Sequence, residues 1–326
     1  IWPICEQKMK LQTIIPLHKN TKNLIDYHSK VFLLGSCFVE NIGQKLSHFK
    51  FQNSQNPFGV LFHPKAIETL VVRALQQKEY NDDEVFFHNE QWHCFDAHSQ
   101  MSNNCKETLI ANLNEQLQVT KKQLQQASHI IITLGTAWVY KHCESHMSVA
   151  NCHKVAQNNF TKALLSINEI TDTLQNLQNK IKEINANVIL IFTVSPIRHI
   201  KDGFIENTHS KAHLIAAIHD FIAQQDDTDN FYFPSYEIMM DELRDYRFYA
   251  EDMVHPNATA INYIWEKFQS VWLSEDALET MEEVDSIQKG MAHLPFNPNS
   301  EAHTSFLKKL KLRKEALQKK FQFITF

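Results

Sequence analysis

Short apolar runs alternate with amphipathic stretches along most of the chain. Three runs, at residues 31–34, 129–134 and 188–194, consist almost entirely of apolar residues, many of them β-branched or aromatic. Such runs are expected of parallel strands that helices cover on both faces. A shorter run at residues 231–233 is a fourth candidate strand. The pattern predicts an α/β fold with a mainly parallel sheet.

Helical spacing separates these strands. Residues 39–49 and 258–268 have helical character, and Leu109, Leu113 and Leu117 share one helical face. The clearest amphipathic series has apolar residues three and four positions apart. Its members are Phe160, Leu164, Ile167, Ile170, Leu174, Leu177, Ile181 and Ile184. Two of these helices lead directly into a strand, which is the alternation of a doubly wound sheet.

The alternation of strands and helices ends near residue 275. Residues 277–290 and 305–321 have helical patterns, and a turn-rich break at 294–300 separates them. We therefore expect one domain over residues 9–275, a helical C-terminal extension over 276–326, and an upstream extension over 1–8, before Met9. The basic last helix would suit an acidic partner or a membrane surface. We favour the simpler interpretation, an exposed face of a helix packed on the domain.

Composition narrows the function. The chain has 326 residues, of which 43% are hydrophobic and 21% charged, and its net charge is −5. These values are typical of a globular protein, and they leave no basic surface for binding nucleic acid or anionic membranes. The six cysteines form no C-x-x-C pair, and no stretch resembles a secretory leader. We expect a reduced, cytoplasmic protein.

The first candidate for chemistry is the junction after the first strand. The six glycines are few for this length, so each is expected where the backbone needs one. Gly35 ends the strand at 31–34, and Ser36 precedes a predicted helix. This junction places a hydroxyl at the carboxyl edge of the sheet, where the N–H groups of the helix suit a developing oxyanion. Alone, such a sequence is often only a turn.

The second candidate lies near the end of the α/β region. Asp252 and His255 are three residues apart, just before the helix predicted at 258–268. A serine nucleophile needs a base, and a histidine base needs a carboxylate to orient it. A lone Asp-x-x-His is more often a solvated loop, but together with Ser36 it predicts a Ser36–His255–Asp252 triad. Cys37 is expected to point away from Ser36 as a small buried apolar residue.

These residues resemble two related groups of proteins. A nucleophile near the N-terminus and a late D-x-x-H resemble the SGNH, or GDSL-like, hydrolases. Residues 35–38, Gly-Ser-Cys-Phe, are similar to the signature of the GSCFA family, with Val39 in place of its alanine. The other similar blocks are residues 56–59, 134–140, 151–154, 195–199, 206–207, 210–211 and 252–256. The resemblance implies a three-layer α/β/α sandwich and acyl-ester chemistry without a cofactor.

The resemblance also implies an oxyanion hole. In SGNH enzymes it combines the nucleophile's N–H, a glycine N–H and an asparagine side chain. Gly59 fits the glycine, but Ala137 stands where the asparagine would be. Losing one donor costs on the order of a hundredfold or more in rate. Thr136 and Asn151 are the candidates to replace it.

Further residues near the predicted edge are candidates for substrate binding: Trp138, His153, Arg198 and His199. Trp138 would equally suit the core, and Arg198 would equally suit a structural salt bridge. Within residues 93–98, His, Cys and Asp are all metal-ligand types, but their spacing matches no zinc motif and also fits a strand. We expect no metal there. His98 and Ser99 are candidates for the wall of the site.

Three hypotheses follow. The first is a serine esterase that cleaves an acyl ester, acetyl among the candidates, from a small molecule or saccharide. The second is an O-acyltransferase in which a saccharide-like hydroxyl replaces water. The third is a binding protein that has lost activity, suggested by the missing asparagine. A Ser36 hydroxyl far from His255 would favour the third. The oligomeric state is not predicted.

Overall fold

A five-stranded parallel sheet forms the centre of the protein. The computed structural model describes residues 12–225 and 229–326, and the strand order is β10-β9-β5-β1-β2. The strands are β1 (Lys30–Gly35), β2 (Gln52–Gln55), β5 (His129–Leu134), β9 (Ile189–Val194) and β10 (Asn230–Tyr232). Every pairing between them is parallel. The predicted parallel sheet is confirmed, and only the polar edge strand β2 was not expected.

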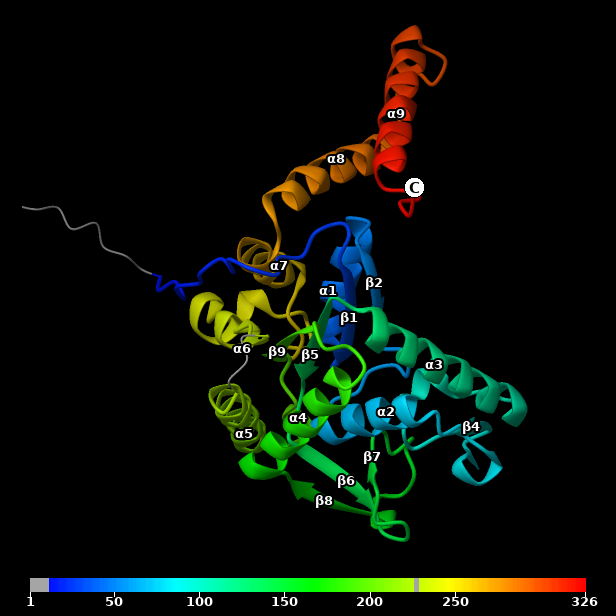
Figure 1. Cartoon of the computed structure of the whole chain (residues 1–326), viewed down its shortest axis with the longest axis vertical. Coiled ribbons are helices and arrows are strands. Elements are labelled where there is room, and N and C mark those ends of the chain that lie inside the picture. The colour runs from blue at the N-terminus through cyan, green and yellow to red at the C-terminus, as the bar shows by residue number, and fades with distance from the viewer. Residues whose placement is uncertain (1–11, 226–228) are drawn as a thin grey trace, which may run out of the picture.

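Helices cover both faces of this sheet (Figure 1). One face carries α2 (Pro64–Gln76), α3 (Lys106–Gln126), α4 (Ile167–Lys182) and α5 (Phe204–Ala223). The other carries α1 (Phe38–His48) and α7 (Ala258–Trp272), with the short α6 (Ser235–Glu237) nearby. Alternate β1 residues divide between the two cores, Phe32 and Leu34 in one and Val31 and Leu33 in the other. The three-layer α/β/α sandwich is thus confirmed.

One predicted helix begins later than its apolar spacing indicates. Residues 160–164 form β8 (Phe160–Leu164), which joins β6 (Trp138–His142) and β7 (Ser148–Val149) in a small antiparallel sheet. Ser166 and Glu169 form a capping box that begins α4, because each side chain satisfies a free backbone N–H of the other. A hairpin of β3 (Phe86–His88) and β4 (Gln91–His93) is the remaining sheet.

Two C-terminal helices form an arm that projects from the sandwich (Figure 1). They are α8 (Glu275–Ala292) and α9 (Glu301–Lys320), and Arg313 pairs with Glu283 between them. Only Leu310 and Leu317 of α9 are buried, so its basic residues face solvent. Past α9, Phe321 stacks on Tyr27 with ring centres 5.0 Å apart and returns the chain to the body.

The extension predicted at residues 1–8 lies outside the described residues. Among the helices of the described part, none is both long and apolar enough to cross a membrane.

The strand order defines where a ligand is expected. Strand β1 pairs with β2 along one edge and with β5 along its other edge, so the order of strands reverses direction at β1. Open α/β sheets bind ligands at the carboxyl ends of their strands, at such a reversal of direction. The segments that leave β1, β5 and β9 all begin at this edge.

Candidate active site

A glycine shapes the turn at the carboxyl end of β1. Gly35 has φ +134°, and a Cβ there would lie 2.1 Å from the carbonyl oxygen of Thr133. The next N–H, of Ser36, donates to the same carbonyl at 3.0 Å. Only glycine permits this close approach of two strands. The turn places Ser36 and Cys37 beside the end of β5.

The predicted Asp252–His255 pair is formed in the loop before α7. Asp252 Oδ2 accepts the Nδ1 proton of His255 at 2.6 Å. Its other oxygen accepts the backbone N–H groups of Val254 at 2.9 Å and His255 at 3.0 Å. These bonds, led by the backbone N–H of His255, lower the pKa of Asp252 to about 2. With Nδ1 protonated, Nε2 of His255 is left as the proton acceptor.

The side chain that faces this acceptor belongs to Cys37. Its Sγ lies 3.9 Å from Nε2 of His255, and the residue is half-buried at the N-cap of α1. Cys37 points away from Ser36 as expected, but it is half-buried rather than buried, and its thiol faces His255. At the start of a helix, successive side chains are offset by about 100°, so the residue after Ser36 faces the D-x-x-H loop.

Ser36, which the sequence predicts as the nucleophile, does not face His255. It is fully buried, and among the described residues its Oγ has no hydrogen-bond partner. The Ser36 side chain lies next to Gly135. A Cβ added to Gly135 would be 3.1 Å from Ser36 Cβ and 3.0 Å from His199 Nε2. The serine therefore occupies a closed recess shared with His199, and no hydrogen bond joins it to His255.

Burial and several neighbouring groups shift the pKa of the Cys37 thiol. Burial raises its pKa most strongly, and Glu40 adds to this, whereas its own N–H, that of Phe38 and the Lys211 ammonium lower it. Lys211 is 1% exposed and donates to the carbonyls of Gly135 at 2.7 Å and Ser195 at 2.8 Å. It thereby joins the ends of β5 and β9, and burial lowers its pKa to about 7.

The predicted oxyanion donors are mostly engaged elsewhere. The N–H of Gly59 donates to Asn56 O at 2.8 Å, and that of Thr136 donates to Phe62 O at 3.0 Å. The Thr136 hydroxyl accepts the N–H of Trp138 at 3.0 Å and lies 3.0 Å from the hydroxyl of Ser210. These two residues are thus structural in the resting protein. The N–H groups at the start of α1 are engaged in part as well. Those of Val39 and Glu40 donate to Ser36 O at 2.8 Å and Cys37 O at 3.1 Å, whereas those of Cys37 and Phe38 act on the Cys37 thiol.

A cleft of about 650 Å³ opens next to His199. Four predicted site residues line it: Thr136, Trp138, Asn151 and His199. Asn151 accepts the N–H of His153 at 2.8 Å through Oδ1, and Trp138 donates its indole N–H to Glu206 O at 3.2 Å. Burial, followed by the charges of Lys211 and His255, lowers the pKa of His199 to about 3, so this imidazole is neutral.

His153 and Ser99, two further candidates for the site, bond to one another. His153 is buried, with Nδ1 at 3.3 Å from the Ser99 hydroxyl and Nε2 at 2.7 Å from Cys94 O. Both ring nitrogens are therefore used within the protein. These bonds give His153 a structural role, and its role as a substrate ligand stays a prediction.

Arg198 contacts the segment that carries Asp252 and His255, and its role in substrate binding stays a prediction. Its guanidinium lies over the rings of Tyr249, at 4.0 Å, and Tyr246, at 5.0 Å. Its backbone N–H donates to Val254 O at 3.3 Å, next to His255. The structure shows neither the anion clamp nor the salt bridge considered for it; the contacts are cation–π interactions.

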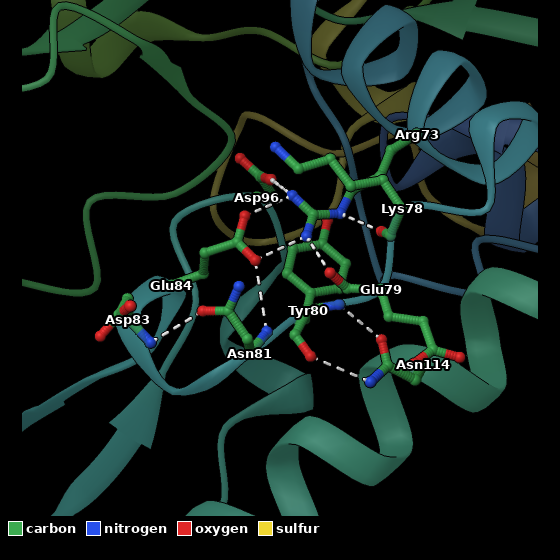
Figure 2. Close-up of polar contacts among 9 residues, drawn as sticks. All are labelled: Arg73, Lys78, Glu79, Tyr80, Asn81, Asp83, Glu84, Asp96 and Asn114. Atoms are coloured by element: carbon green, nitrogen blue, oxygen red, sulfur yellow. Dashed lines mark hydrogen bonds and ion pairs between the residues drawn. The ribbon is translucent and has the colours of Figure 1, made fainter.

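A buried ion pair holds the segment that leads to His98 (Figure 2). Arg73 donates to both carboxylate oxygens of Glu84, at 2.6 and 2.7 Å, and to two backbone carbonyls. Tyr80 lies under the guanidinium at 3.5 Å and donates its hydroxyl to Asp96 at 3.1 Å. Burial raises the pKa of Asp96. This network is structural, because every named group bonds to another within it.

The residues considered as metal ligands do not converge. His93 bonds through its two ring nitrogens to Ser102 Oγ at 2.6 Å and His88 O at 2.9 Å. Across residues 12–225 and 229–326, no three His, Cys, Asp or Glu side chains are grouped as a metal site requires.

Comparisons with known proteins identify the family. No curated protein matches the sequence. Among solved structures, an acetyl xylan esterase (Est2A) from the rumen bacterium Butyrivibrio proteoclasticus is similar, with a TM-score of 0.38 and 11% identity. The match covers 82% of this chain and 66% of that one, just under two thirds of its length. Residues 284–326 match the C-terminal domain of GSCFA domain proteins. Residues 30–268 match the GSCFA family itself, and the chain belongs to this family.

Proposed function

We propose that the protein is an acyl-transfer enzyme that cleaves a carboxylic ester through an acyl-enzyme on Cys37. In this proposal His255 is the general base, and Asp252 orients it. One observation carries it: the Cys37 Sγ, His255 Nε2, His255 Nδ1 and Asp252 Oδ2 atoms are linked in series by contacts of 3.9 and 2.6 Å. Nucleophile, base and orienting carboxylate in this order form the constellation that activates a weak nucleophile.

The first half of the reaction acylates the thiol. His255 Nε2 takes the thiol proton as Sγ bonds to the ester carbonyl carbon. The N–H groups of Cys37 and Phe38, at the start of α1, stabilise the resulting oxyanion. When the carbon–oxygen bond to the alcohol breaks, the imidazolium returns its proton to the departing oxygen. The acyl group is then held as a thioester on Cys37.

The second half releases the acid and restores the thiol. His255 removes a proton from water as its oxygen attacks the thioester carbon. The carbon–sulfur bond breaks, and Sγ recovers the proton from His255. An alcohol in place of water would give acyl transfer, the alternative predicted from the sequence. His255 and Asp252 each have side chains 49% exposed, so water has access and hydrolysis is the primary proposal.

The serine esterase predicted from the sequence remains the second candidate for the same chemistry. It requires Ser36 Oγ to reach Nε2 of His255, and the buried, unpartnered position of that hydroxyl does not favour it. The inactive binding protein was expected to show a nucleophile separated from its base. That description fits Ser36 but not Cys37, whose thiol faces His255.

Covalent labelling separates these possibilities. The protein is treated with an iodoacetamide probe and a fluorophosphonate probe, and turnover of p-nitrophenyl esters is followed. We expect Cys37→Ala to abolish turnover and iodoacetamide labelling at this site, whereas Ser36→Ala keeps both. Cys105→Ala is the control, because it removes another free thiol that lies outside the lining of the cleft. Fluorophosphonate labelling lost in Ser36→Ala would instead establish the serine enzyme, and no turnover or labelling would establish the inactive protein.

The proposed chemistry also bears on location. The described cysteines are free, and a thiol nucleophile must stay reduced to act. Reducing conditions are those of the cytoplasm, so the cytoplasmic location predicted from the sequence remains our proposal.

A further inference from the structure

We propose that the cleft beside His199 binds the acyl group of the substrate, and that this group is an apolar chain longer than acetyl. The inference deepens the proposed acyl-transfer function and rests on it. The position of the cleft, the chemistry of its walls and its volume each support the assignment.

The cleft begins next to the reactive residues. Thr136 and His199 belong to its lining, and both follow directly on strands of the central sheet. Gly135 lies between His199 and Ser36, with close approaches of 3.0 and 3.1 Å to an added Cβ. Cys37 is the next residue after Ser36. Cys37 itself is not among the lining residues, so in this assignment the carbonyl carbon lies at the thiol and the rest of the acyl group extends past His199 into the cleft.

The walls are mainly apolar. Aromatic side chains supply much of the surface: Phe62, Trp138, Tyr140 and Phe160. Small aliphatic residues, among them Val149 and Ala150, fill the space between them. The one carboxylate in the lining, Asp202, is paired with Lys162 at 2.5 Å. An apolar ligand loses little by entering such a surface and gains the hydrophobic contribution of each methylene.

The volume argues against acetyl as the full occupant. A cleft of about 650 Å³ is in the range that holds a drug-sized molecule, and an acetyl methyl would leave most of it unfilled. Aromatic walls also suit a saccharide ring. A saccharide, however, needs several hydrogen-bonding groups. Asn151 Oδ1, the Trp138 indole N–H and Asp202 already have protein partners, which leaves Lys154, Gln157 and Lys201 as the main polar side chains of the lining for such a ligand.

The first test uses the wild-type protein and p-nitrophenyl esters from acetyl to octanoyl. We expect kcat/KM to rise about threefold to fourfold per methylene until the cleft is filled. Ala150→Phe, which narrows the cleft, should flatten this rise. Ala163→Phe is the matched control, because Ala163 is another half-buried alanine that lies outside the cleft lining. A flat or falling series in the wild type would overturn the inference, whatever the variants do.

The second test measures binding without chemistry. The Cys37→Ala protein is titrated with octanoate, acetate and cellobiose while tryptophan fluorescence is recorded, and Trp138→Phe identifies the reporter. We expect saturable binding of octanoate alone. Octanoate binding in a protein whose wild type turns over no ester would leave the cleft assignment standing and remove the proposed chemistry. Cellobiose binding without octanoate binding would overturn the cleft assignment and leave the chemistry intact.

Discussion

Asp252 contacts His255 twice, once through the imidazole and once through the backbone. Oδ2 accepts the Nδ1 proton at 2.6 Å, and Oδ1 accepts the backbone N–H at 3.0 Å. Two bonds from one carboxylate fix both the ring and the peptide that carries it. Met253, one of the two residues between them, has φ +58°, a conformation that non-glycine residues seldom adopt without such support.

Replacing this carboxylate should abolish most activity without unfolding the protein. In Asp252→Asn an amide faces Nδ1, so the ring is no longer held in the tautomer that leaves Nε2 free. We expect kcat for ester turnover to fall by a factor on the order of 10² to 10⁴. The urea midpoint should change little, because the side chain is exposed and asparagine Oδ1 can still accept the N–H groups of Val254 and His255. Asp245→Asn, another exposed aspartate near the loop, should retain wild-type turnover. A loss in Asp252→Asn smaller than threefold would contradict the assigned role.

Alkylation of Cys37 should depend on His255. Burial raises the pKa of this thiol, so the reactive thiolate forms readily at neutral pH only if the imidazole accepts the proton. We expect the iodoacetamide rate at Cys37 to fall on the order of tenfold in His255→Ala. Peptide-resolved mass spectrometry follows Cys105 in the same sample, and this exposed thiol should react at an unchanged rate. Equal Cys37 rates in both proteins would show that no proton passes to His255.

The sequence predicts the central sheet well because its strands are buried on both faces. Such strands must be continuously apolar, and residues 129–134 coincide with β5. It fails at β8, where Phe160 and Leu164 happen to continue the helical spacing of α4. Pairing with β6 decides the conformation of these residues, and no local pattern reports a partner twenty residues away.

The pairing of Asp252 with His255 was predictable from their spacing, but the contact of the Cys37 thiol with His255 was not. The choice between Ser36 and Cys37 depends on how the turn after Gly35 rotates each side chain, which composition and spacing do not encode. The GDSL motif itself offered a signal, since Gly35-Ser36-Cys37 puts cysteine where that motif has serine. Lys211 gave no signal of its burial at the strand ends, because lysine on a helix is usually exposed.

Replacing Gly59 by any other residue should destabilise the protein, although the Gly59 N–H donates to Asn56 O. It has φ +72°, and an added Cβ would lie 2.5 Å from His98 Cβ. We expect Gly59→Ala to lower the free energy of unfolding by about 1–3 kcal/mol, measured by urea denaturation. Gly290→Ala is the control, since a Cβ at this helical glycine would meet side-chain ends only, the flexible tip of Leu310 at 2.9 Å and the ring edge of Phe306 at 3.3 Å. An effect no greater than that of the control would contradict the strain argument.

The ion pair between Arg73 and Glu84 should contribute to stability more than its exposed counterpart (Figure 2). Arg73 has a side chain 8% exposed, and removing it leaves a partly buried carboxylate without its partner. We expect Arg73→Met to cost about 3 kcal/mol of unfolding free energy. Arg313→Met removes a similar two-bond pair to Glu283 at 42% exposure, and should cost about 0–1 kcal/mol. Equal losses in urea denaturation would show that burial does not set the difference.

His63 should make the protein less stable in mild acid. It caps α2 by accepting the Ala66 N–H at 3.1 Å and donates to Val149 O at 3.0 Å, and burial lowers its pKa from 6.5 to about 4. Between these values the unfolded chain binds a proton that the folded one cannot, so its contribution is complete above pH 6.5 and is lost as the pH falls towards 4. The loss amounts to roughly 3 kcal/mol.

Urea denaturation at pH 7 and pH 5 measures this slope. His63→Asn keeps a side chain that can cap α2 but does not titrate, so the variant should lose less stability between the two pH values than the wild type. His18→Asn removes an exposed histidine and should leave the wild-type slope. His153 and His199, whose pKa values are also lowered by burial, act in the same direction in all three proteins. The comparison therefore isolates His63, and identical slopes in His63→Asn and wild type would mean that its imidazole titrates alike in the folded and unfolded chains.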